Sequence, residues 1–99
     1  MKKTIINILR NFLSHEIIIE SWGSRNFVIN ENQISFDVSA LKYVGTIIIQ
    51  VNEKQKCDIL FSDGKLQDVN YENITEEIDN YIEKTDCYIS DLITILLGN

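Results

Sequence analysis

The spacing of apolar residues changes twice along this chain, and that change restricts the fold more than any other feature of the sequence. Near the N-terminus the apolar positions follow a helical stripe, made by Ile5, Ile8, Leu9, Phe12 and Leu13. From Ile17 the period becomes two, which is typical of strands with one buried face, and after Asn73 the helical period returns. The order helix, strands, helix predicts an α+β fold, in which an antiparallel sheet of five to six strands carries the N- and C-terminal helices on one face.

The strand-like segments differ in the neighbours that they require. Residues 16–21, 26–30 and 33–39 are rich in β-branched or aromatic residues and are expected to form strands with one face in water. Residues 46–52 are apolar on both faces at their centre, which predicts a strand in the middle of the sheet. Asp63 and Gly64 separate the last two strand-like runs, and this pair favours the positive backbone angles of a tight hairpin turn.

The final helix is expected to begin at Asn73. Asn73 and Glu76 have the spacing of a capping box, in which each side chain accepts a hydrogen bond from a free backbone amide. The apolar stripe then continues to the C-terminal end, so residues 74–97 form either one long helix or two, the second capped by Asp86. Ile95 and Leu97 widen this stripe, and a homodimer is therefore one expectation.

Composition suits a single domain over residues 1–99, since 44% of the residues are hydrophobic. Asn7 and Arg10 interrupt the first apolar stretch, so we expect no secretory signal, and no apolar run approaches the roughly 20 residues that cross a bilayer. Cys57 and Cys87 lack the spacing of a zinc site, and Cys57 shares the alternation of a strand, so it is expected to be a buried thiol. These features predict a cytoplasmic protein with no membrane contact.

No group of residues has the pattern of a catalytic or cofactor site. His15 is the only histidine and is expected at the end of the first helix, where the helix dipole favours a partly positive ring. The four glycines stand too far apart for a phosphate-binding loop, and the residues around Gly64 do not supply the ligands of a calcium loop. We therefore expect no enzyme activity, no cofactor and no bound metal.

Charge is distributed unevenly along the chain, whose formal net charge is −6. Residues 1–62 carry seven basic and six acidic residues, whereas residues 63–99 carry two lysines and nine acidic residues. This excess of acid argues against direct binding to nucleic acid. The acidic side chains form either the solvated side of an amphipathic helix or a surface that imitates nucleic acid and binds a basic protein. Such a surface would include Asp68, Glu72, Glu76, Asp79 and Glu83.

Trp22 and Arg25 flank Gly23 in a predicted turn between the first two strands, and both are of types enriched in interface hot spots. Either they anchor a protein partner, or Trp22 folds back over the edge of the sheet. Together with the acidic residues, they predict a small non-catalytic interaction module, an adaptor or inhibitor that binds a basic protein surface. The alternative is a small-ligand-binding protein or an enzyme with a carboxylate-lined cleft on the sheet.

Overall fold

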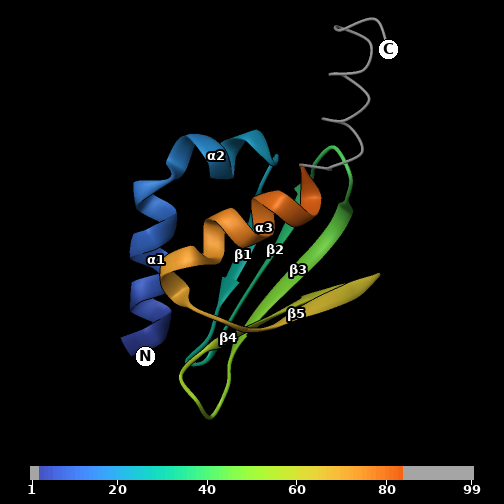
Figure 1. The fold of residues 1–99 in the computed structure, drawn as a ribbon. Helices are drawn as coiled ribbons and strands as arrows, with labels where there is room; N and C mark the ends of the chain where they lie inside the picture. The colour runs from blue at the N-terminus through green and yellow to red at the C-terminus, as the bar shows by residue number, and fades with distance from the viewer. Residues whose placement is uncertain (1–2, 84–99) are drawn as a thin grey trace, which may run out of the picture.

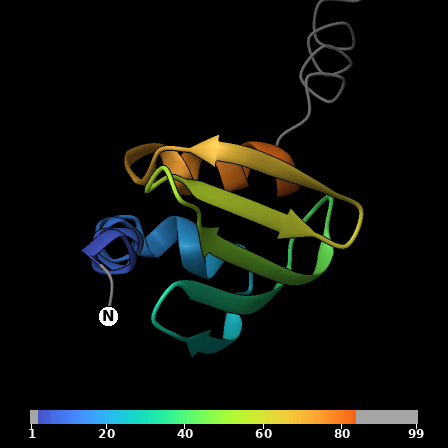
Figure 2. The ribbon, with the colours of Figure 1, turned by 90° about the horizontal axis from the view of Figure 1, so that it is seen from below.

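The computed structural model describes residues 3–83, which form helices on one side of a five-stranded antiparallel sheet (Figure 1). In chain order the elements are α1 (Lys3–Ser14), α2 (Glu16–Ser21), β1 (Arg25–Ile29), β2 (Gln33–Ser39), β3 (Val44–Val51), β4 (Cys57–Phe61), β5 (Gly64–Val69), the 3-10 helix η1 (Tyr71–Asn73) and α3 (Ile74–Ile82). The strands lie side by side in chain order, from β1 at one edge to β5 at the other (Figure 2). The predicted α+β fold with five to six strands is confirmed.

The core lies between the helices and one face of the sheet. Alternate residues of β2, β3 and β4 are buried, and the register places them opposite one another, as Phe36 opposite Ile47 and Ile49 opposite Ile59 show. The helices cover this face with Ile5, Ile8 and Phe12 from α1, Ile19 from α2, and Ile74, Ile78 and Ile82 from α3. Each buried side chain of this size contributes roughly 1.5–3 kcal/mol, so the described parts of the two predicted apolar stripes stabilise the fold through the same core.

The predicted position of residues 46–52 in the middle of the sheet is also confirmed. Strand β3 pairs with β2 on one side and with β4 on the other. Ile47 and Ile49 face the core, whereas Ile48 lies half-buried on the opposite face between β2 and β4. A strand with two neighbours shelters part of its outer face, which explains why three consecutive isoleucines are compatible with this position.

The prediction of a strand over residues 16–21 is wrong, because this segment is helix α2. In a strand, Ile17 and Ile19 would face the same side, but Ile17 is 84% exposed and Ile19 is buried. The helix instead directs Ile19 and Trp22, three residues apart, into the core. Tertiary packing thus overrides the strand preference of the β-branched isoleucines.

Helix α1 ends at Ser14, so the predicted position of His15 at its end is confirmed. The His15 ring nitrogen Nδ1 lies 2.8 Å from the carbonyl oxygen of Asn11. The ring therefore meets one of the free carbonyl groups of the last helical turn. This contact gives His15 a structural part at the corner between α1 and α2.

The predicted hairpin after residue 61 is present, but the predicted reason for Gly64 is wrong. Phe61 pairs with Gly64 across the turn, and neither Asp63 nor Gly64 has a positive φ. A Cβ atom at Gly64 would instead lie 2.5 Å from the hydroxyl oxygen of Tyr81. Glycine is required there because the Tyr81 ring of α3 packs closely on the hairpin.

Asn73 occupies the N-cap position of α3, as predicted, but the predicted capping box is not formed. The Asn73 side chain makes no capping hydrogen bond, and its backbone continues the turn of η1. The helix therefore begins from a preformed 3-10 turn instead of from a capped extended residue. Three predictions concern residues outside the described part of the chain. These are whether residues 74–97 form one helix or two, the cap at Asp86, and the widening of the apolar stripe by Ile95 and Leu97. Within residues 3–83, no helix is long and apolar enough to cross a membrane.

Cys57 is fully buried in β4, as predicted, and burial raises the pKa of its thiol to about 11, with a smaller contribution from Asp58. A raised pKa means that the folded state holds a proton that the unfolded state releases from about pH 9 upward. The stabilisation that Cys57 provides is thus complete below pH 9. We expect its loss between about pH 9 and 11, at up to about 1.4 kcal/mol per pH unit.

The measurement is urea unfolding of the wild type and of Cys57→Ala at a series of pH values. The difference in unfolding free energy between the two proteins should shrink as the pH rises above 9, because only the wild type has this thiol. The other ionising groups are common to both proteins and cancel. A difference that stays constant to pH 11 would contradict the raised pKa.

Candidate functional site

Strand β1 is an edge strand whose apolar side chains are not covered by the described part of the chain. All five of its residues are exposed, and Phe27 and Ile29 are 42% and 41% exposed. Ile29 lies opposite the buried Ile34 of β2, so its side chain is on the face that carries the helices. Phe27 is on the same face, since its ring stacks on Phe36 at 5.0 Å between centroids. Of the first three strands, only β1 therefore has inner side chains that the described helices leave exposed.

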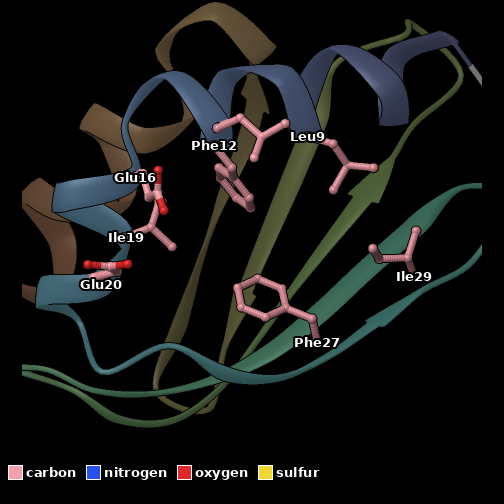
Figure 3. A pocket seen from close by; sticks show the side chains of 8 residues that line it. Leu9, Phe12, Glu16, Ile19, Glu20, Phe27 and Ile29 are labelled. Carbon is pink, nitrogen blue, oxygen red and sulfur yellow. The ribbon is translucent and has the colours of Figure 1, made fainter.

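An apolar groove of about 400 Å³ runs between this strand and helices α1 and α2 (Figure 3). We call it the α1–β1 groove, and it is lined by Leu9, Phe12 and Leu13 of α1, Glu16, Ile19 and Glu20 of α2, and Phe27 and Ile29 of β1. In Figure 3 the side chains of Leu9 and Phe12 point from the helix toward those of Phe27 and Ile29. Six of the eight lining residues are therefore apolar.

Two carboxylates mark the end of the groove at α2. Glu16 and Glu20 are one helical turn apart and lie on either side of Ile19 in Figure 3. Within residues 3–83, no lysine or arginine lines the groove and neither glutamate forms a salt bridge. The groove thus combines an apolar wall with a negative end.

The apolar surface extends beyond the groove through Leu13, which is 75% exposed. Leu13 and Glu16 also line an adjoining hollow with Ile17 and Ile18. Both isoleucines are exposed, as is Leu13. Monomeric proteins seldom leave such a continuous set of large apolar side chains in water, and such surfaces commonly mark interaction sites.

Strand β1 contains a β-bulge near its start, a few residues after the end of α2. The register with β2 shifts between Arg25 and Val28, and Asn26 has a φ of 58°. The Asp37 carboxylate holds the bulge, because it accepts hydrogen bonds from the Thr46 hydroxyl at 2.6 Å and from the Asn26 amide at 2.9 Å. These bonds, and then the charge of Arg25, lower the pKa of Asp37.

Of the two alternatives for Trp22, the structure contradicts the partner anchor and favours a side chain that folds back onto the sheet. Its side chain is 0% exposed, its ring stacks on Phe36, and its Nε1 donates a hydrogen bond to Asp79 at 3.0 Å. Trp22 is a core residue because α3 and the sheet enclose it. Arg25 stays exposed and donates hydrogen bonds to the Gly23 carbonyl and to the Ser39 hydroxyl, each at 3.2 Å. The two residues do not form one surface.

The five predicted acidic residues are not equivalent in the structure. Asp68 has a φ of 54°, accepts a hydrogen bond from Asn52 at 2.7 Å and forms a salt bridge with Lys54 at 3.3 Å, so its charge is partly neutralised. Asp79 is half-buried and accepts the bond from Trp22. Glu72 and Glu76 are exposed on η1 and α3, and Glu83 is half-buried at the C-terminal end of α3. The structure does not join these carboxylates to the α1–β1 groove.

Sequence reasoning misses the apolar lining of the groove altogether. It assigns Leu9, Phe12, Leu13 and Ile19 to a core stripe or a strand, and Phe27 and Ile29 to an ordinary strand. One signal is present, since Phe27, Val28 and Ile29 are consecutive apolar residues, and the structure places them on an edge strand. An apolar run on an edge strand leaves side chains exposed unless something covers them.

No group of three or more histidine, cysteine or acidic residues in the described part of the chain is arranged to hold a metal ion. Comparisons of the chain with protein-family models, with curated proteins and with solved structures found no match.

Proposed function

We propose that this protein is a non-catalytic interaction module, an adaptor or inhibitor, that binds a protein partner through the α1–β1 groove. The observation that carries the proposal is the groove itself, which six apolar side chains from three elements line beside two glutamates, with Leu13, Phe27 and Ile29 exposed to water. An occupant that covers the exposed parts of Leu13, Phe27 and Ile29 would remove apolar surface from water, at roughly 25 cal/mol per Å². Part of that gain offsets the entropy lost on association.

The charge of the protein favours a basic partner. Glu16 and Glu20 lie at the groove with no basic residue among the described residues that line it, and the whole chain carries a net charge of −6. A field of one sign speeds the encounter with an oppositely charged protein and keeps like-charged nucleic acid away. We therefore propose a cytoplasmic partner protein with lysine or arginine beside an apolar surface.

A second function is favoured by one observation, the size of the groove. A volume of about 400 Å³ falls within the range of small-ligand sites, and its glutamates would suit a ligand with an apolar body and an amine. A thermal-shift screen of such amines separates the two functions. A stabilisation that saturates with one amine and is lost in Leu13→Asp would favour the small ligand over the protein partner.

Leu13→Asp is expected to abolish partner capture without unfolding the protein. Leu13 is 75% exposed and lines the groove, so an aspartate there places a charge in the apolar wall at little cost in stability. Leu41→Asp is the matched control, because Leu41 is 71% exposed and lies outside the groove. The measurement is a quantitative pull-down from lysate of the native host, at low and at high salt.

The proteins of interest in that experiment are those that the wild type and Leu41→Asp capture and that Leu13→Asp does not. Their capture should weaken as the salt concentration rises, since screening acts on the exposed glutamates. If Leu13→Asp and Leu41→Asp capture the same proteins in the same amounts, the groove is not the binding surface.

A further inference from the structure

The helical layer formed by the described residues ends before the sheet does. Helices α1, α2 and α3 bury the inner side chains of β2, β3 and β4, but those of β1 are exposed. Phe27 and Ile29 lie on this inner face, and Phe12 and Leu9 of α1 face them across the groove (Figure 3). The uncovered place above β1 therefore has α1 on one side and β1 beneath it. One more helix packed there would continue the layer that covers the rest of the sheet.

An added strand fits the free edge of β1 less well than a helix fits the groove. Only Val28 and Ile29 are paired in succession with β2, and the bulge begins immediately before them. The positive φ of Asn26 turns the backbone away from a regular ladder. Bulged and short edges offer few aligned backbone groups to an incoming strand. The occupant therefore gains more from side-chain packing in the groove than from main-chain pairing at the edge.

The carboxylates at the α2 end select the charge of the occupant. Glu16 and Glu20 are four residues apart, and no basic residue among the described lining of the groove offsets them. Lysines or arginines one turn apart on a helix have a matching spacing. The C-terminal segment of this chain, residues 84–99, is apolar at Ile89 and Leu92 but carries two aspartates and one lysine, so its charge does not complement the groove.

We propose that the α1–β1 groove binds an amphipathic helix of a basic partner protein. This inference rests on the proposed function and names the class of partner. The apolar face of the helix, with residues at i, i+3 or i+4 and i+7, lies between α1 and β1 against Phe12, Leu13 and Phe27. Its lysines or arginines lie on the flank that faces Glu16 and Glu20. A helix of three turns, roughly 11 residues and 16 Å long, presents such a face.

The test uses two synthetic peptides of about 16 residues with the same leucine stripe at helical spacing. One carries lysines four residues apart on one flank of the stripe, and the other carries glutamates at those positions. Binding of each labelled peptide to the full chain is measured by fluorescence anisotropy. We expect the lysine peptide to bind about three- to tenfold more tightly than the glutamate peptide. This ratio of affinities should fall as salt is added.

Variants of the protein locate the peptide. Leu13→Asp should weaken binding of the lysine peptide at least about tenfold, whereas Leu41→Asp should leave its affinity unchanged. The double variant Glu16→Gln and Glu20→Gln should remove most of the preference for lysine over glutamate while both peptides still bind. If the double variant still prefers the lysine peptide, Glu16 and Glu20 do not select a basic helix, and that part of the proposal is overturned.

Two further outcomes would overturn the proposal. If the lysine peptide does not bind at millimolar concentration, or binds Leu13→Asp as well as the wild type, the groove does not take a basic helix. If the wild type is a dimer in solution and Leu13→Asp is a monomer, the occupant is a second copy of this chain. In either case the proposed function would still hold if, in the pull-down, the wild type captures a protein that Leu13→Asp does not capture.

Discussion

Trp22→Ala is expected to lower the free energy of unfolding by about 3–5 kcal/mol. The side chain is 0% exposed and stacks on Phe36 at 6.5 Å between ring centroids. Its Nε1 also joins α2 to α3 through the hydrogen bond to Asp79. Removing the indole leaves a cavity beneath two helices and removes a donor from a half-buried carboxylate, and both changes act in the same direction.

The measurement is urea unfolding followed by circular dichroism, because Trp22 is the only tryptophan and cannot report on its own removal. For a domain of this size each kcal/mol lowers Tm by about 4–8 °C, so the melting temperature should fall by at least about 12 °C. Arg25→Ala is the control, and it should change stability by less than about 0.5 kcal/mol because the side chain is exposed. A Trp22→Ala protein as stable as Arg25→Ala would show that the indole is not in the core.

The sequence predicted the elements whose residues meet a single buried face. Ile34, Phe36 and Val38 alternate because β2 has one side against the helices, and the same reasoning located β4. Strand β3 was located by the opposite pattern, since its centre is apolar on both faces. Periodicity failed at residues 16–21, where three consecutive isoleucines satisfy a strand and a helix equally. Only the burial of Ile19 and Trp22 decides between them, and Trp22 is held by a hydrogen bond to Asp79 of α3, which is far away in the chain.

The same error concealed the candidate site. In a strand, Glu16 and Glu20 would lie on the opposite face from Ile19, whereas in α2 all three line the groove. The groove also depends on β1 being at the edge, which is a property of the strand order and not of its own sequence. Acidic composition predicted a basic partner, but most of the unbalanced acidic residues lie in the C-terminal part of the chain, so the composition does not distinguish these two glutamates.

Gly64→Ala is expected to lower the free energy of unfolding by about 1–3 kcal/mol, although Gly64 does not have a positive φ. The added methyl group would lie 2.5 Å from the hydroxyl oxygen of Tyr81, and this ring cannot easily move away. It stacks on Phe61 at 3.8 Å between centroids and donates a hydrogen bond to Asp63 at 2.9 Å. These contacts fasten α3 to the β4–β5 hairpin, so the strain should be felt by the whole fold.

Tyr81→Phe distinguishes this close contact from a general preference for glycine in the turn. The variant removes the oxygen that the new Cβ would meet and keeps the ring that stacks on Phe61. Alone it should cost about 0.5–1.5 kcal/mol, because the bond to Asp63 is lost. In the Tyr81→Phe background Gly64→Ala should be nearly neutral, which gives a coupling of at least about 1 kcal/mol in a double-mutant cycle measured by urea unfolding. An equal cost of Gly64→Ala in both backgrounds would mean that the turn backbone, and not the approach of the Tyr81 ring, requires glycine.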